Sequence, residues 1–91
     1  MADKEKVTIW MQSGTPQGVL VAKLSHDLGY EYEVKNITTK YSWAEMRAAL
    51  PNTVPNKEHA DVPQIFYGTT YVGGSFKDFT TYLNVDVTKL G

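Results

Sequence analysis

The sequence predicts a single α/β domain, with a four-stranded mixed sheet flanked by three helices in the order β-α-β-α-β-β-α. Three observations predict this class. Strand-like runs alternate with segments of helical periodicity. A Gly-Thr pair joins two of the strand-like runs as a tight hairpin. The 91 residues suffice for one core but not for two. A right-handed crossover makes the first two strands parallel.

The first strand and the first helix have the clearest signals. Val7–Met11 is apolar almost throughout, which is typical of a central strand covered on both faces. Thr15 is a favourable N-cap, and Pro16 suits the first helical position because its missing N–H would have no partner there. Gly29 is placed to end the helix in a left-handed conformation. The stripe that this helix buries consists of Leu20, Leu24 and Leu28.

The second strand and the second helix follow. Tyr30–Val34 alternates aromatic or aliphatic residues with charged ones, which predicts a strand with one solvated side. Ser42 and Glu45 have the spacing of a capping box, in which each side chain accepts a hydrogen bond from the other residue's amide. This helix is expected to run to Leu50 and to end at Pro51.

The C-terminal part predicts a hairpin and a third helix. After a polar loop over residues 52–61, Gln64–Tyr67 and Thr70–Val72 flank the Gly-Thr turn. Ser75 and Asp78 are placed to cap a helix with apolar side chains at Phe76, Phe79 and Leu83. The domain is therefore expected to span residues 7–84, with a flexible N-terminus over 1–6 and an unassigned tail over 85–91.

Composition excludes several classes of function. A net charge of −1 without a basic run gives no footprint for nucleic acid, and no apolar stretch approaches the roughly 20 residues that cross a bilayer. No signal peptide is recognised, so a cytoplasmic location is expected. The chain has no cysteine, which removes disulfides and thiolate nucleophiles. His26 and His59 lack metal-ligand spacing, so no metal site is expected.

Two segments of the chain resemble the glutaredoxin family, whose members have the thioredoxin fold. The stronger match is Asp-Val-Pro-Gln-Ile-Phe-Tyr-Gly-Thr-Thr-Tyr-Val-Gly-Gly over residues 61–74, and the weaker is Gln-Ser-Gly-Thr-Pro-Gln-Gly over residues 12–18. The second segment resembles the loop that holds the family's Cys-Pro-Tyr-Cys motif. The compact length and the divergent loop also resemble phage-encoded glutaredoxins.

The resemblance implies a binding groove for glutathione or for an extended protein segment. In the family the proline at the position of Pro63 is cis, and the residue at Val62 pairs its backbone with the ligand as a short extra strand. Gly73 and Gly74 then lead to a helix N-terminus that binds a carboxylate. The spacing after Gly74 departs from the family's pattern by one residue, so the cap contact stays open. The candidate ligand-binding residues are Gln12, Thr15, Pro16, Gln17, Val62, Pro63, Gly73, Gly74, Ser75 and Asp78.

The departures from the family concern its chemistry. Thr15 and Gly18 occupy the positions of the two cysteines, and Gln12 occupies the position of a lysine that assists them. A hydroxyl forms no exchangeable bond with sulfur, and a threonine nucleophile needs an adjacent base. The resemblance therefore implies that no residue of this chain is catalytic in thiol–disulfide exchange.

Four hypotheses for the function remain open at this point. The first is a redox-inactive homologue, expected to be a monomer without a required cofactor, that binds glutathione or an extended protein segment. The second is a glutathione-dependent enzyme in which Thr15 donates a hydroxyl hydrogen bond, although the chain has no room for the second domain that such transferases carry. The third is a purely structural or partner-binding module. The fourth is a variant of an active glutaredoxin whose cysteines were replaced.

Overall fold

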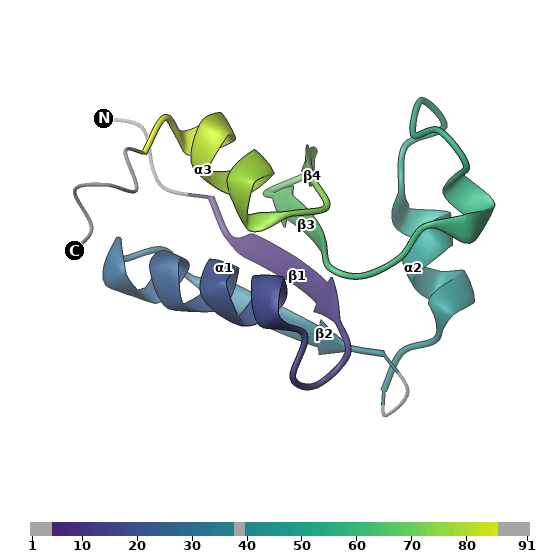
Figure 1. The fold of residues 1–91 in the computed structure, drawn as a ribbon, viewed down its shortest axis with the longest axis horizontal. Coiled ribbons are helices and arrows are strands. Elements are labelled where there is room, and N and C mark those ends of the chain that lie inside the picture. Colours follow the sequence, from purple (N-terminus) through teal and green to yellow (C-terminus); the bar gives the residue numbers. More distant parts are fainter. Residues whose placement is uncertain (1–4, 38–39, 86–91) are drawn as a thin grey trace.

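A computed structural model describes residues 5–37 and 40–85 of the chain. Its elements follow the predicted order, and a short 3-10 turn in the polar loop is added to them (Figure 1). The elements are β1 (Val7–Met11), α1 (Pro16–Asp27), β2 (Tyr32–Asn36), α2 (Trp43–Ala49), the 3-10 turn η1 (Lys57–His59), β3 (Gln64–Tyr67), β4 (Thr70–Gly73) and α3 (Phe76–Leu83).

The sheet has the strand order β2-β1-β3-β4. β1 runs parallel to β2 and antiparallel to β3, and β3 pairs with β4 in an antiparallel hairpin. Ile9 lies at the centre, opposite Val34 on one side and Ile65 on the other. The prediction that Val7–Met11 is a central strand is confirmed, and β3 is the other central strand, which leaves β2 and β4 as the two edges.

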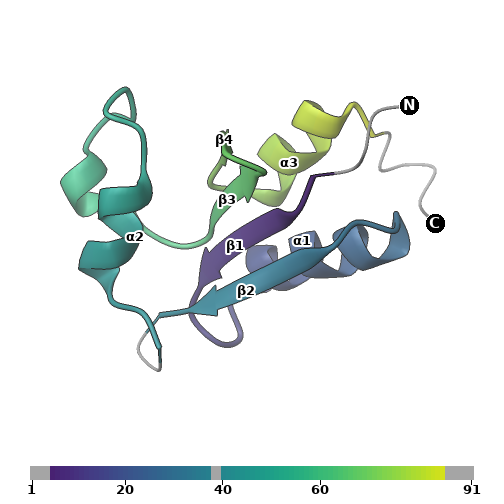
Figure 2. The same cartoon turned by 180° about the vertical axis from the view of Figure 1, so that it is seen from behind.

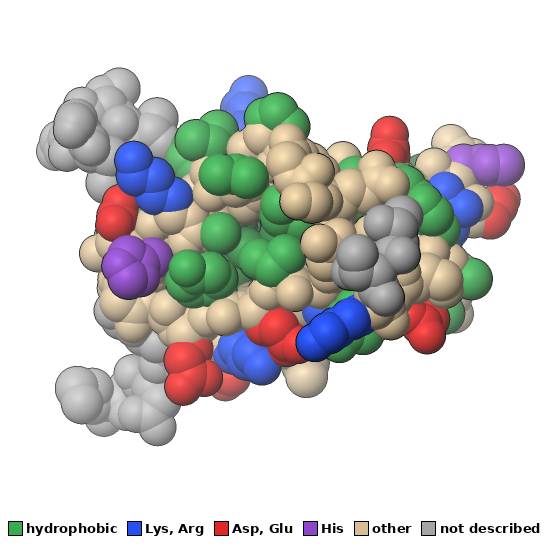
Figure 3. All heavy atoms as spheres, turned by 90° about the horizontal axis from the view of Figure 1, so that it is seen from below, with side chains coloured by type: hydrophobic (Ala, Val, Ile, Leu, Met, Phe, Trp, Pro, Cys, Tyr) green, Lys and Arg blue, Asp and Glu red, His purple; other side chains and the backbone are tan. Residues whose placement is uncertain are grey.

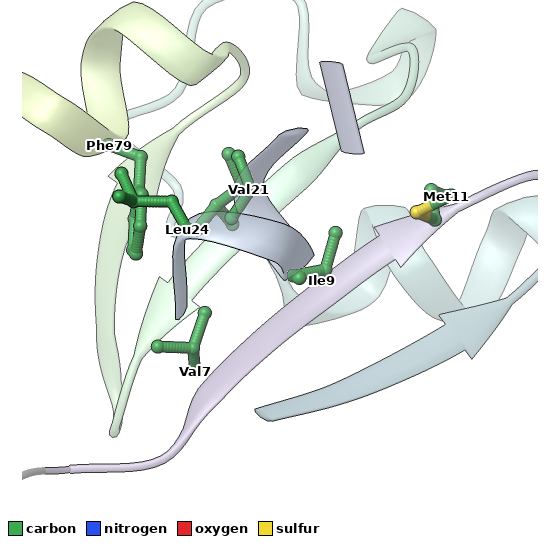
Figure 4. Packing of buried hydrophobic residues seen from close by; sticks show 7 residues of the cluster. Val7, Ile9, Met11, Val21, Leu24 and Phe79 are labelled. Atoms are coloured by element: carbon green, nitrogen blue, oxygen red, sulfur yellow. The ribbon is translucent and has the colours of Figure 1, made fainter. Parts of the chain in front are cut away.

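Helices α1 and α3 cover one face of the sheet (Figure 1), and α2 lies on the other side, beyond one end of the strands (Figure 2). Alternate residues of β1 point to the two sides. Figure 4 shows the larger cluster, in which β1 meets α1 and α3. Its buried members are Val7, Ile9, Met11, Val21, Leu24, Ile65 and Phe79. The prediction that Leu20 is buried was wrong: it is 47% exposed, because the buried face of α1 is centred on Val21, Leu24 and Ser25. On the opposite face Trp10 packs with Ile37 and Met46.

Element boundaries differ from the predictions at three places: β2 is shifted at both ends and stops at Asn36, β4 extends to Gly73, and α2 is one residue shorter. β2 begins at Tyr32 instead of Tyr30, because the Tyr30 amide donates to the Ser25 carbonyl at the end of α1 and its ring packs edge-on against Tyr67. α2 ends at Ala49. Leu50 is already extended, as expected for a residue that precedes a proline.

The chain ends contribute three described residues. The Glu5 amide donates to the Tyr67 hydroxyl at 3.0 Å, Lys6 forms a 2.8 Å ion pair with Glu33, and the Val85 amide donates to the Thr80 carbonyl. The remaining parts of the predicted N-terminus over 1–6 and of the tail over 85–91 lie outside the described residues. Across residues 5–37 and 40–85, no helix has the length and apolar character that crossing a membrane requires.

Candidate functional site

The predicted site residues come from three segments that meet at one end of the sheet. Trp10 pairs with Gln64, so the loop that follows β1 and the segment that precedes β3 lie at the same end. The start of α3 reaches this loop, because the Phe76 amide donates to Gln17 Oε1 at 2.8 Å. Gly74 lies close to the Pro63 carbonyl, since a Cβ built on Gly74 would be 3.2 Å from that oxygen.

The Val62–Pro63 peptide bond is cis, as the resemblance implied, and Pro63 is buried. The Val62 amide donates to the Asp61 side chain, with 2.8 Å between N and Oδ1. The donor that the resemblance offers to a ligand is therefore covered by a carboxylate of the preceding residue. This hydrogen bond is on the surface.

The start of α3 is covered in the same way. The Gly74 amide donates to Asp78 Oδ2 at 3.2 Å, and the Asp78 amide donates to Ser75 Oγ at 3.1 Å. Gly73 has a φ of 152°, and a Cβ there would overlap the Asp78 side chain, so only glycine fits. The predicted caps Ser75 and Asp78 are both in place. Asp78 puts a carboxylate of the chain itself where the resemblance implied a ligand carboxylate.

Thr15 is the N-cap of α1 by its backbone, but its side chain does not cap the helix. The hydroxyl donates instead to the Gln12 carbonyl at 2.7 Å, and the Thr15 amide donates to the same oxygen. The predicted N-cap position of Thr15 is confirmed, but its hydroxyl makes no capping hydrogen bond, because the tight turn after β1 brings the Gln12 carbonyl within reach. A hydroxyl has one hydrogen, and that of Thr15 is used in the hydrogen bond to the Gln12 carbonyl.

Gly18, at the position of the second cysteine, is buried against Met11. A Cβ on Gly18 would overlap Met11 Sδ and would lie 3.2 Å from Met11 Cβ. Met11 is itself part of the core and only 5% exposed. The absence of a side chain at Gly18 therefore lets α1 lie close to β1.

A hydrogen-bond relay behind the Val62–Pro63 bond was not predicted. The Tyr71 hydroxyl donates to Gln64 Oε1, and Gln64 Nε2 donates to the Asp61 carbonyl, both at 2.6 Å. Gln64 is buried, and burial, with a smaller contribution from the Asp78 charge, raises the pKa of the Tyr71 phenol. The relay fixes the segment before Pro63. In the sequence, the only indication of this relay is the glutamine that follows Pro63.

The residues gathered at this end of the sheet include hydrogen-bonding groups but no thiol nucleophile for redox chemistry. The chain has no cysteine, so it cannot perform thiol–disulfide exchange. Among the described residues, no group of three His, Asp or Glu side chains is placed to hold a metal ion. The groups at the site are backbone amides, the Gln12 and Gln17 side chains, and the carboxylates of Asp61 and Asp78.

Comparison with known proteins supports the fold alone. No protein-family model and no curated protein matches the chain. Among solved structures, the chain is similar to the crystal structure of glutaredoxin 1 from Francisella tularensis complexed with cacodylate. The TM-score is 0.60 at 20% sequence identity, over 87% of this chain and 92% of that one. The chain thus has a glutaredoxin-like thioredoxin fold, without the cysteines that thiol chemistry needs.

Proposed function

We propose that this chain is a non-redox binding module that takes an extended peptide segment at the groove between Gln12, Val62 and Gly74. One observation carries the proposal: the three segments expected to form a groove meet at one end of the sheet, and exposed side chains accept the hydrogen bonds of the Val62, Gly74 and Phe76 amides. Exposed hydrogen bonds of this kind contribute little net stability, so the backbone of a ligand can replace them.

The charges at the groove favour a cationic or neutral segment. Asp61 and Asp78 each place a carboxylate on an amide that a ligand would use. An anionic ligand must displace a like charge, whereas a lysine or an amino terminus is attracted by both carboxylates. Glutathione carries two carboxylates and forms no covalent bond here, so its expected affinity is millimolar or weaker, about −4 kcal/mol at most.

The groove gives no support to a hydroxyl-donor enzyme. Thr15 donates its hydroxyl hydrogen to the Gln12 carbonyl, and a bound thiolate would have to compete with that 2.7 Å hydrogen bond. Gln12 supplies no positive charge to hold a thiolate. Binding is therefore the function that these contacts support best.

An NMR titration with three short probes tests the proposal. The probes are acetyl-Val-Lys-Val-amide, acetyl-Val-Glu-Val-amide and reduced glutathione. We expect amide shifts to cluster at Gln12, Val62, Gly74 and Ser75, and to be largest with the lysine peptide. Asp78→Asn should reduce the preference for lysine over glutamate. The matched control Asp27→Asn, at the end of α1, should leave that preference unchanged.

Two outcomes would overturn the proposal. One is the absence of shifts at the groove with any probe at millimolar concentration. The other is a set of shifts confined to a different face of the molecule. Shifts at the groove with glutathione that equal those with the lysine peptide would instead contradict the charge argument and favour glutathione as the ligand.

A further inference from the structure

The edge strand β2 exposes its apolar side chains, Tyr32 and Val34, to solvent. Tyr32 and Val34 are 41% and 39% exposed, as much as the charged Glu33 side chain on the opposite face, which is 39% exposed. Tyr32 lies on the α1 side, where its ring meets the His26 ring edge-on at 6.5 Å. The apolar side of the strand is therefore left partly uncovered by α1.

The outer backbone of β2 is directed away from the sheet. The Val7 amide donates to the Glu31 carbonyl, and the Ile37 amide donates to the Met11 carbonyl. Backbone groups of successive residues in a strand point to opposite sides, so Glu33 and Lys35 also bond toward β1 and Val34 points outward. Figures 1 and 2 show no described element along this outer side. The Asn36 carbonyl accepts from the Lys40 and Tyr41 amides, so the open part of the edge is centred on Val34.

An apolar patch continues from this edge onto α1. Figure 3 looks onto β2 and α1 and shows hydrophobic side chains gathered in the middle of the face, with charged side chains around them. Val19, 49% exposed, lies two helical turns before His26, so it shares the face of α1 that borders the exposed side chains of Tyr32 and Val34. An uncovered strand edge beside exposed apolar side chains is a template for pairing with another strand.

The charges of β2 make its edge complementary to itself in one register. If two copies pair antiparallel about Val34, Glu33 of each copy faces Lys35 of the other. These are non-hydrogen-bonded positions, where Cα atoms are about 4.5 Å apart and side chains are closest. Centring the pair on Glu33 or on Lys35 would instead place two like charges opposite each other. Centring it on Tyr32 would place Glu33 opposite Glu31.

We propose that the β2 edge binds the β2 edge of a second copy of this chain, antiparallel and with a two-fold axis at Val34. The two four-stranded sheets then form one continuous sheet, and the exposed Val19, Tyr32 and Val34 side chains of the two copies come together. The present partner of Glu33 does not prevent this, because the Lys6–Glu33 ion pair is itself exposed and its carboxylate can be shared. The self-association replaces the sequence-based expectation of a monomer and uses none of the groove residues.

Analytical ultracentrifugation with charge-reversed variants tests the proposal. The wild type should show a reversible monomer–dimer equilibrium from micromolar to millimolar concentration. Glu33→Lys and Lys35→Glu should each weaken self-association at least tenfold, because like charges then face each other twice. An equimolar mixture of these two variants should recover association, because opposite charges face each other in the mixed pair. The double variant with both substitutions in one chain should also self-associate.

Matched controls separate the edge from general charge effects. Glu58→Lys and Lys77→Glu make the same charge changes on η1 and α3, and their association should equal that of the wild type. Val34→Pro removes the outward amide and should abolish dimers, with folding verified by circular dichroism. A wild type that stays monomeric at millimolar concentration overturns the proposal. The proposal is also overturned if the wild type forms a dimer but the mixture of Glu33→Lys and Lys35→Glu does not recover association.

Discussion

At the scale of single residues, Thr15 determines what the start of α1 can do. Its hydroxyl is held by the Gln12 carbonyl, and its backbone caps the helix. Thr15→Cys would place a thiol at the positive end of a 12-residue helix, where the anionic form is favoured. We expect a thiol pKa below the ordinary value of about 8.5, and a further decrease when Gln12→Lys is added.

The ultraviolet absorbance of the thiolate during a pH titration measures this effect. Thr69→Cys, in the exposed β3–β4 turn, is the matched control and should titrate near the ordinary value. Thr15→Cys should also gain measurable activity on a glutathionylated peptide, with a modest rate because Gln12 is uncharged. A folded and accessible Thr15→Cys without such activity would show that the groove does not orient a glutathionyl group.

Tyr71 carries a second residue-scale prediction, which concerns pH. Tyr71→Phe leaves the buried Gln64 Oε1 without its donor and should destabilise the fold by about 1–3 kcal/mol. The phenol pKa is higher in the folded chain than its ordinary value of 10.0, so the unfolded chain loses this proton first as pH rises. The advantage of the wild type over Tyr71→Phe should be constant below pH 10 and should shrink above it.

Urea unfolding at a series of pH values checks this prediction. Tyr82→Phe is the matched control, because Tyr82 is 45% exposed and, within residues 5–37 and 40–85, contacts Tyr67 through its ring and not through a hydrogen bond of its hydroxyl. It should change stability little at any of these pH values. A loss at Tyr71→Phe no larger than that at Tyr82→Phe would contradict the role of the relay.

At the scale of elements, the capping box decides where α2 begins. The Glu45 amide donates to Ser42 Oγ at 3.1 Å, and the Ser42 amide donates to Glu45 Oε2 at 3.0 Å. Ser42→Ala should cost about 1 kcal/mol of the free energy of unfolding, measured with urea. Ser13→Ala, at an exposed bend outside the helices, is the control and should be near neutral. If both substitutions changed the free energy of unfolding equally, the capping box would not contribute to stability.

Local pattern was sufficient for most of these elements. β1 and β3 match the predicted ranges to the residue, because near-continuous apolar runs have one stable place, the middle of the sheet. The range of β2 shifted, since its alternation extends beyond the part that β1 pairs with, and pairing sets the ends of a strand. The turn η1 was missed because its three residues, Lys57–His59, have no apolar periodicity.

At the scale of the whole molecule, the sequence predicted which segments meet at one end of the sheet, but not which side chains cover their amides. The motif around Pro63 and Gly74 indicated which segments would meet. The hydrogen bonds of Asp61, Gln17 and Asp78 to the groove amides depend on where tertiary folding leaves each side chain, and no spacing rule contains that information. The exposure of Tyr32 and Val34 in β2 could not be predicted for the same reason, because it depends on how much of the strand α1 covers.

The proposed peptide site and the proposed β2 interface lie on different parts of the sheet, so both can be used at once. The peptide site is proposed around the β1–α1 loop, the segment before β3 and the start of α3, whereas the β2 edge is separated from β3 by β1. A dimer built through β2 would carry two grooves. Each would then bind its segment independently or together with the other, depending on whether the two segments belong to one partner chain.

The contact between Gly18 and Met11 limits the evolutionary routes open to this chain. A cysteine at position 15 needs only one substitution at an N-cap, whereas a cysteine at position 18 must first find room that Met11 occupies. A side chain at position 18 therefore requires Met11 to change its rotamer or to be replaced by a smaller residue. One amino-acid substitution at position 15 gives a single-thiol variant without moving the core, whereas a dithiol variant also perturbs the packing of α1 on β1.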